Sequence, residues 1–225
     1  PPPPPPPPPT TPPPPPPTPP YTCRRQRQMC IRDSRQAQQL WALLKRRAVA
    51  VAARKQLQQS FSEISLSAQA LFTQFQQLLA RIDLRIRKLI QALGWTNDYR
   101  CCLSIPGIGP LNAAALVAAC HRGAFAKSDT FIAFIGMDVR LRESGRYKGK
   151  RKLTKRGEAE LRRLLYCAAQ PARCYQPFED FYQRQLDKGL PKIAAKVILA
   201  RKLARIAFSL MNKQQMFIKR ADPIA

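Results

Sequence analysis

The sequence is poor in metal-binding side chains. It has one histidine, His121, and 13 acidic residues among 225, and none of its seven cysteines forms a Cys-x-x-Cys pair. A zinc centre needs a cluster of thiolate and imidazole ligands, so this composition argues against one. From Arg35 onward we expect the cysteines to be small buried hydrophobic side chains in a reducing compartment. These are Cys101, Cys102, Cys120, Cys167 and Cys174.

Long apolar runs are also missing. No segment approaches the roughly 20 consecutive apolar residues of a membrane-spanning helix, and no signal-peptide core is visible. Alternation of apolar and polar residues with period two is scarce as well, and 137–141 is the one candidate strand. These absences predict an all-α protein with no membrane partner.

Acidic residues are outnumbered by 39 lysines and arginines, which gives a net charge of +26. Four of those arginines and one acid precede Arg35, so the remaining 191 residues carry 35 basic and 12 acidic side chains and a net charge of +23. An excess of this size indicates a polyanionic partner. A membrane surface is the alternative to nucleic acid.

Proline is concentrated at the N-terminus, where 17 of the 23 prolines lie in residues 1–20. Such a run is extended or disordered and forms no core. The next segment, 21–34, contains RQRQMCIRDS, which resembles translated sequencing adapter at the ends of metagenomic gene models. We therefore interpret 1–34 as an assembly artefact. A genuine proline-rich tail that binds a partner is the alternative.

Residues 35–94 are predicted to form a helical arm, because 35–93 contain neither proline nor glycine. Leu71, Phe75 and Leu78 recur eleven residues later as Ile82, Ile86 and Leu89, a spacing typical of a nearly straight apolar stripe. The stripe favours self-association through a coiled coil, with packing on the chain's own domain as the alternative. A capping-box spacing at 60–63 predicts a break near 60–67, and Gly94 is expected to end the arm.

A compact helical domain is predicted over 95–217, followed by a tail over 218–225. Helices are expected at about 110–121, 130–135, 158–175 and 177–187, and from Pro191 onward. The last helix should bury one face. That face comprises Ile193, Val197, Ala200, Leu203, Ala204, Ala207 and Leu210.

The segment LSIPGIGPLNAAALVAA, at 103–119, has the pattern of a helix-hairpin-helix. Gly107 and Gly109 allow a tight turn around Ile108, and Pro110 suits the first position of the next helix. Free N–H groups at that helix start bind anions such as a DNA phosphate. We therefore predict nucleic-acid contacts at Gly107, Ile108 and Gly109. A helix corner without a ligand is the alternative.

A basic loop over 137–156, MDVRLRESGRYKGKRKLTKR, follows that hairpin. Glycines at 145, 149 and 157 indicate a shaped loop rather than a helix face, and so dense a charge is relieved when phosphates lie between the side chains. A solvated charged face is the alternative. The nine predicted contacts are Arg140, Arg142, Arg146, Lys148, Lys150, Arg151, Lys152, Lys155 and Arg156.

Ser144 lies beside Gly145 in the middle of this loop. A serine ringed by guanidinium groups suits a nucleophile that attacks a phosphodiester, because the arginines stabilise the charge of the transition state. A serine also needs a base or a metal, and Glu143 is the only local carboxylate. From the residues alone, an ordinary turn serine is the favoured interpretation.

The two motifs, SIPGIGPLNAAALVA and FIAFIGMDVRLRESGRYKGKRKLTKRGEAELRRLLY, together resemble the C-terminal transposase domain of the insertion-sequence-110 family. The resemblance covers about 95–217, and the arm resembles the family's coiled coil less specifically. It implies DNA strand breakage and rejoining, with Ser144 as the catalytic nucleophile joined to the DNA phosphate. It also implies a structured guide RNA as a partner and a cytoplasmic, nucleoid-associated location in bacteria.

The chain departs from this family in one respect. The resemblance implies an acidic tetrad that binds Mg²⁺ in a RuvC-like domain ahead of the arm, and residues 1–34 contain one acid, Asp33. We therefore expect no cofactor in this chain, Mg²⁺ being expected in the missing domain. The chain should bind DNA or RNA without completing recombination unaided. The alternatives are a non-catalytic nucleic-acid-binding protein and a structural oligomerisation module.

Overall fold

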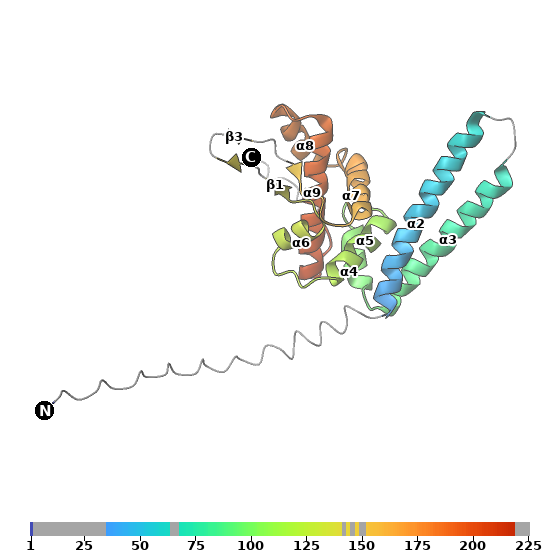
Figure 1. Ribbon diagram of the computed structural model, residues 1–225, viewed down its shortest axis with the longest axis horizontal. Helices are drawn as coiled ribbons and strands as arrows, with labels where there is room; N and C mark the ends of the chain where they lie inside the picture. Colours follow the sequence, from blue (N-terminus) through green and yellow to red (C-terminus); the bar gives the residue numbers. More distant parts are fainter. Residues whose placement is uncertain (2–34, 64–67, 141–142, 145–146, 149–151, 219–225) are drawn as a thin grey trace. The chain divides into compact units, whose positions relative to one another are not determined.

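A computed structural model describes residues 1, 35–63, 68–140, 143–144, 147–148 and 152–218 (Figure 1). Apart from residue 1, the predicted segment 1–34 lies outside these residues. The prediction of an all-α protein is confirmed. The exceptions are four strands of two residues each, all within the basic loop.

The arm consists of two helices packed against each other, α2 (Arg35–Ser60) and α3 (Gln69–Ala92). A short 3-10 turn, η1 (Phe61–Glu63), ends the first helix. The predicted break is confirmed, but the predicted capping box is wrong: Ser60 is the last residue of α2, and α3 starts only at Gln69. In the turn that follows Ser60, the Ser62 hydroxyl donates to the carbonyl of Gln59. The hydroxyl is therefore satisfied within the turn that it closes.

The apolar stripe of α3 has two different environments. Near the compact domain, Ile86 and Leu89 are buried in the same core as α5. Farther out along the helix, Leu71 and Leu78 are exposed, although they belong to the same repeat. The stripe therefore packs on the chain's own domain at one end and is open at the other. The arm ends at Gly94, as predicted, since its N–H closes the last turn of α3.

The compact domain contains α4 (Thr96–Leu103), α5 (Pro110–His121), α6 (Ser128–Phe134), α7 (Ala159–Ala172), α8 (Phe178–Asp187) and α9 (Lys192–Lys213). Helix α9 contacts each of the other five. The small side chains of Ala200, Ala204 and Ala207 are fully buried on it, which permits close approach of its neighbours. The predicted helix positions are therefore confirmed, while α4 was not predicted as a separate helix.

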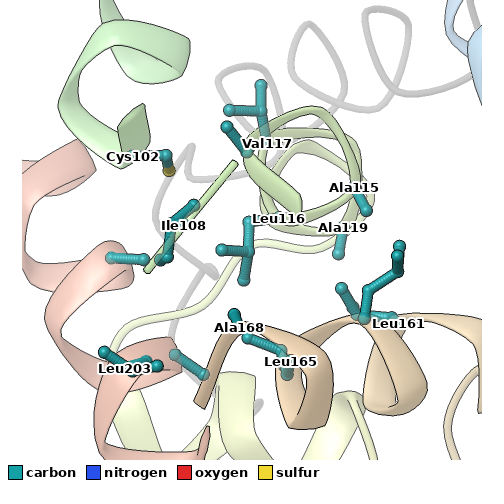
Figure 2. Packing of buried hydrophobic residues seen from close by; sticks show 14 of the residues in the cluster. Cys102, Ile108, Ala115, Leu116, Val117, Ala119, Leu161, Leu165, Ala168 and Leu203 are labelled. Atoms are coloured by element: carbon teal, nitrogen blue, oxygen red, sulfur yellow. The ribbon is translucent and has the colours of Figure 1, made fainter. Parts of the chain in front are cut away.

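Helix α5 lies inside the domain, and Ala113–Ala119 are all buried. Figure 2 shows Leu116 of α5 lying over Leu165 and Ala168 of α7. A helix that is apolar on every side is typical of a fully buried element. The small alanine side chains of α5 thus allow it to pack against several neighbouring helices at once.

Three sequence predictions are wrong in detail. Ile193 is 68% exposed, because at the first turn of α9 the core lies under Ala195 instead. Cys167 and Cys174 are exposed rather than buried. Helix α7 ends at Ala172 rather than at 175, because the N–H groups of Cys174 and Tyr175 donate to carbonyls only three residues back, those of Pro171 and Ala172.

Candidate nucleic-acid interface

The turn between α4 and α5 is built around a glycine that packs inward. Gly107 has a φ of +87°, and a Cβ there would lie 2.6 Å from the Cβ of Ala172. Ile108 is buried beside it and closes the turn by donating its N–H to the carbonyl of Ile105. Two of the three predicted contact residues, Gly107 and Ile108, are therefore occupied by packing against the chain's own core.

Gly109 occupies a different position. It is the N-cap of α5 with extended backbone angles, and no atom lies within 4 Å of where its Cβ would be. Pro110 follows as the first helical residue. The open space above Gly109 lets a ligand reach the start of α5, where N–H groups and the helix dipole favour an anion.

A small cleft of about 260 Å³ adjoins the start of α5. It is lined by residues of the arm and of the hairpin, including Arg47, Asp83, Arg87, Tyr99 and Leu111. Arg47 is paired with Asp83, its Nε lying 2.5 Å from Oδ1. Arg87 is exposed, and none of the ion pairs within the described part of the chain includes it. Its guanidinium is thus available to a phosphate at the helix start.

Tyr99 separates this cleft from a second one of about 250 Å³ that also contains Arg87 and Arg100. Burial raises the pKa of Tyr99, and Asp83 adds to this effect, against the opposing influence of Arg87. The phenol is therefore neutral at physiological pH and can donate a hydrogen bond. Sequence reasoning missed Arg47 and Arg87, because only the docking of the arm brings them to the start of α5. It also missed Tyr99, which lies on α4 directly before the turn.

The basic loop begins and ends at two glycines in close contact. A Cβ on Gly136 would lie 2.5 Å from the backbone nitrogen of Gly157, and a Cβ on Gly157 would lie 2.6 Å from the carbonyl oxygen of Ile135. Arg162 of α7 fixes this junction by donating from Nη1 to the carbonyl of Gly157 at 2.5 Å. We call this junction, formed by Ile135, Gly136, Gly157 and Arg162, the loop neck.

Above the loop neck the chain forms a short antiparallel ladder. Strand β1 (Val139–Arg140) pairs with β4 (Lys152–Leu153). The Thr154 hydroxyl bonds the carboxylate of Asp138, and its N–H donates to the Asp138 carbonyl. Lys155 has a φ of +56° and donates its N–H to the carbonyl of Gly136. Within the predicted candidate strand at 137–141, Val139 and Arg140 form β1. Residue 141 and the glycines at 145 and 149 lie outside the described residues.

Ser144 lies in a second, inner ladder. Strand β2 (Glu143–Ser144) pairs with β3 (Tyr147–Lys148), and Ser144 is opposite Tyr147. Lys155 and Arg156 are exposed at the loop exit. Of the other predicted contacts, Arg142, Arg146, Lys150 and Arg151 lie outside the described residues, and for Arg140, Ser144, Lys148 and Lys152 the structure describes the backbone.

The described residues contain no group of three or more histidine, cysteine or acidic side chains placed to hold a metal ion. This part of the chain therefore offers no fitting ligand set for Mg²⁺. His121, the only histidine of the sequence, is held by Asp98 with its Nε2 2.6 Å from Oδ2. Burial raises the pKa of Cys102 and raises that of Cys120 to about 12, so both thiols stay protonated.

The part of the chain that carries the turn before α5 and the basic loop is similar in sequence to known proteins. Residues 99–183, from α4 to α8, match the sequence model of the transposase IS116/IS110/IS902 family. A protein described as a probable family 20 transposase, from Pseudomonas aeruginosa, is 32% identical over 151 residues. That alignment covers 64% of this chain and 44% of the relative. This chain thus spans less than half the length of the relative it matches.

Over residues 99–183 the compact domain is similar to a transposase domain. The family that it matches there is that of the IS116/IS110/IS902 transposases, and the resemblance read from the two sequence motifs is confirmed. Among the described residues, no helix is both long and apolar enough to cross a membrane.

Proposed function

We propose that this chain is the DNA-binding and strand-cleaving part of an insertion-sequence transposase. The observation that carries the proposal is the loop neck, which holds the basic loop with Ser144 on the same domain as the open start of α5. Two separate groups of phosphate contacts then act on one nucleic acid. The DNA backbone would lie along the basic loop and along the cleft beside Gly109, with Arg87 at its edge.

In the proposed reaction the Ser144 hydroxyl oxygen attacks a backbone phosphorus atom. The Oγ–P bond forms, the bond from phosphorus to a deoxyribose oxygen breaks, and that oxygen leaves with a proton. The serine proton passes to a general base, and the leaving oxygen takes up a proton in return. Because the phosphoserine is an ester like the bond it replaces, attack by another strand's hydroxyl reverses the step and rejoins DNA. The loop's arginines would stabilise the extra negative charge of the transition state.

The test uses a full-length transposase that carries this domain, incubated with a target plasmid and Mg²⁺. Ser144→Ala should abolish covalent protein–DNA adducts and leave DNA affinity nearly unchanged. Ser209→Ala, an exposed serine on α9, serves as the control and should keep forming adducts. Adduct formation by Ser144→Ala at the wild-type rate would contradict the assignment.

A second candidate function is non-catalytic binding of nucleic acid. The contacts of His121 favour this function. Its ring is stacked on Trp95 with centroids 4.1 Å apart and its Nε2 is bonded to Asp98. With these contacts, His121 is not available as a general base for Ser144. Under this alternative, the hairpin and the basic loop only contact backbone phosphates. Ser144→Ala would then change neither binding nor any product.

A structured guide RNA is the further partner that we propose. The net charge of +26 exceeds what one short phosphate track neutralises, and phosphate contacts do not distinguish RNA from DNA. Co-purification of a discrete RNA with the full-length transposase, protected from nuclease, is the expected result. Loss of all RNA at a salt concentration that leaves the DNA complex intact would contradict a specific RNA partner.

Self-association through the arm is proposed from its outer part. Val49 of α2 is 69% exposed, and Leu71, Leu78 and Leu84 of α3 are exposed as well. Solvent-exposed apolar side chains at helical spacing are typical of a helix–helix interface. Sedimentation should show a dimer or larger species, and Leu71→Glu with Leu78→Glu should give a folded monomer. A wild-type monomer at all concentrations would contradict the proposal.

A further inference from the structure

A cavity of about 400 Å³ lies between the start of the arm and the end of α5. One side is formed by α2, with Gln38, Trp41 and Lys45 following one another at helical spacing. The other side is formed by Trp95, by His121 at the end of α5, and by Arg122, which follows that helix. Neither of the two motifs that identify the domain accounts for this cavity.

The cavity is lined by aromatic rings and by small side chains. Trp95 is buried, and the partly exposed His121 ring is stacked on it with ring planes only 5° apart, so His121 forms a flat aromatic wall backed by Trp95. Trp41 lines the other side, and Ala37, Ala42 and Ala118 fill little of the space between. Cavities of this size bind small aromatic ligands, and flat rings favour a partner that stacks.

Cations surround the Trp41 ring. The Lys45 ammonium is 5.9 Å and the Arg122 guanidinium 4.8 Å from its centroid. Both cations also converge on one carboxylate oxygen of Glu158, at 3.2 Å and 3.7 Å. An anion thus already occupies the point between them, while both side chains remain about half exposed, at 54% and 44%. A phosphate can therefore approach from the solvent side.

We infer that this cavity binds one unstacked nucleobase of a single-stranded nucleic acid, with its phosphate beside Lys45 and Arg122. Ring faces that stack a base and cations that hold its phosphate are the two features with which proteins bind single strands. A base inside a duplex is stacked on its neighbours and cannot enter without being extruded. The inference rests on the proposed function, because it assumes a nucleic-acid partner.

The structure suggests a direct optical test, because Trp41 and Trp95 are the only two tryptophans of the sequence and both line the cavity. Short single strands of DNA and of RNA are titrated into the full chain, each beside an abasic strand of equal length and charge. Binding is followed by anisotropy and by tryptophan fluorescence. Strands with bases should quench the fluorescence and bind about tenfold more tightly than abasic strands, within the range known for one stacked base.

Variants separate the cavity from the rest of the surface. Trp41→Ala should remove the preference for strands with bases, and Trp41→Phe should keep most of it. Lys45→Gln should lower the affinity for all strands equally. Tyr175→Ala removes an exposed aromatic ring elsewhere and should change nothing. If circular dichroism shows that Trp41→Ala does not fold, the other two variants test the proposal. A preference for strands with bases kept in Trp41→Phe, with affinity for all strands lowered in Lys45→Gln, supports it, and unchanged affinity in Lys45→Gln contradicts it.

The outcomes are distinct. Equal affinity for strands with and without bases, with unchanged fluorescence, overturns the cavity proposal and leaves the proposed function standing. No binding of any strand or duplex overturns both. The difference between the DNA and RNA arms identifies which single strand the cavity prefers.

Discussion

Gly136 and Gly157 lie backbone against backbone, 21 positions apart in the sequence, and a Cβ on Gly136 would lie 2.5 Å from the nitrogen of Gly157. Everything between them belongs to the basic loop. A methyl group on Gly136 would overlap the backbone at Gly157, and one on Gly157 would overlap the backbone at Phe134 and Ile135. Two residues with no side chain thus fix where nine basic residues and Ser144 leave the helical domain.

Gly157→Ala tests this neck. The new methyl group would overlap the backbone of Phe134 and Ile135, and backbone cannot give way as a flexible side chain does. We expect the free energy of unfolding to fall by about 1–3 kcal/mol, typical of an overpacked core, and DNA affinity to fall with it. Urea unfolding and anisotropy measure the two effects. Unchanged stability together with unchanged DNA affinity would show that the neck is not rigid.

Two glycines of one motif are predicted to behave differently. Gly107→Ala combines a positive φ with a collision against α7, so it should cost at least about 2 kcal/mol of stability. The methyl group of Gly109→Ala would contact no described atom, so this variant should lower the free energy of unfolding by less than about 1 kcal/mol. Its effect should instead be a several-fold loss of nucleic-acid affinity, because the methyl group blocks the start of α5. Equal stability losses in the two variants would contradict this division.

Acid sensitivity is predicted from Asp98. Its burial opposes ionisation, but hydrogen bonds with His121 and Gln214 outweigh this, and the pKa of Asp98 lies below its usual value. A lowered pKa means that the carboxylate stabilises the fold above about pH 4 and that this contribution is lost as the pH falls through the folded-state value. Asp98→Asn should lower the free energy of unfolding by about 1–2 kcal/mol at pH 7.

The pH series provides the control for this prediction. The stability difference between wild type and Asp98→Asn should shrink as the pH drops below about 4. Asp187→Asn, at the exposed end of α8, should show little difference at any pH. A gap between wild type and Asp98→Asn that stays constant down to low pH would contradict the ionised form as the source of stability.

Most helices were predictable because proline, glycine and capping residues mark their ends in the sequence. Pro110 begins α5 and Gly136 ends α6 as predicted. The register of burial was less predictable. Ile193 continues the apolar face of α9 in the sequence, yet the neighbouring helices cover only the later turns. A periodic pattern shows which residues share a face, but not where that face meets a partner.

The candidate site was predictable only in part. The basic loop and the turn between α4 and α5 are both recognisable from local sequence patterns. The contact of Gly136 with Gly157 joins two segments through tertiary packing, which no local pattern encodes. The same holds for Arg87, which reaches the start of α5 only because α3 docks there. The glycines of the hairpin also differ in role, since Gly107 contacts α7 and Gly109 faces open space.

The salt dependence of duplex DNA binding tests the central claim that the basic loop holds the nucleic-acid backbone. Each phosphate contact contributes about 0.9 to the slope of log K against log salt. Replacing Lys150, Arg151 and Lys152 with glutamine should therefore reduce the magnitude of this salt slope by about two to three. The charge-matched control neutralises Arg81, Arg85 and Lys88, which are exposed on α3, and should reduce it by less than one such contact. Equal reductions in the two triple variants, or an unchanged slope in the loop variant, would contradict the account.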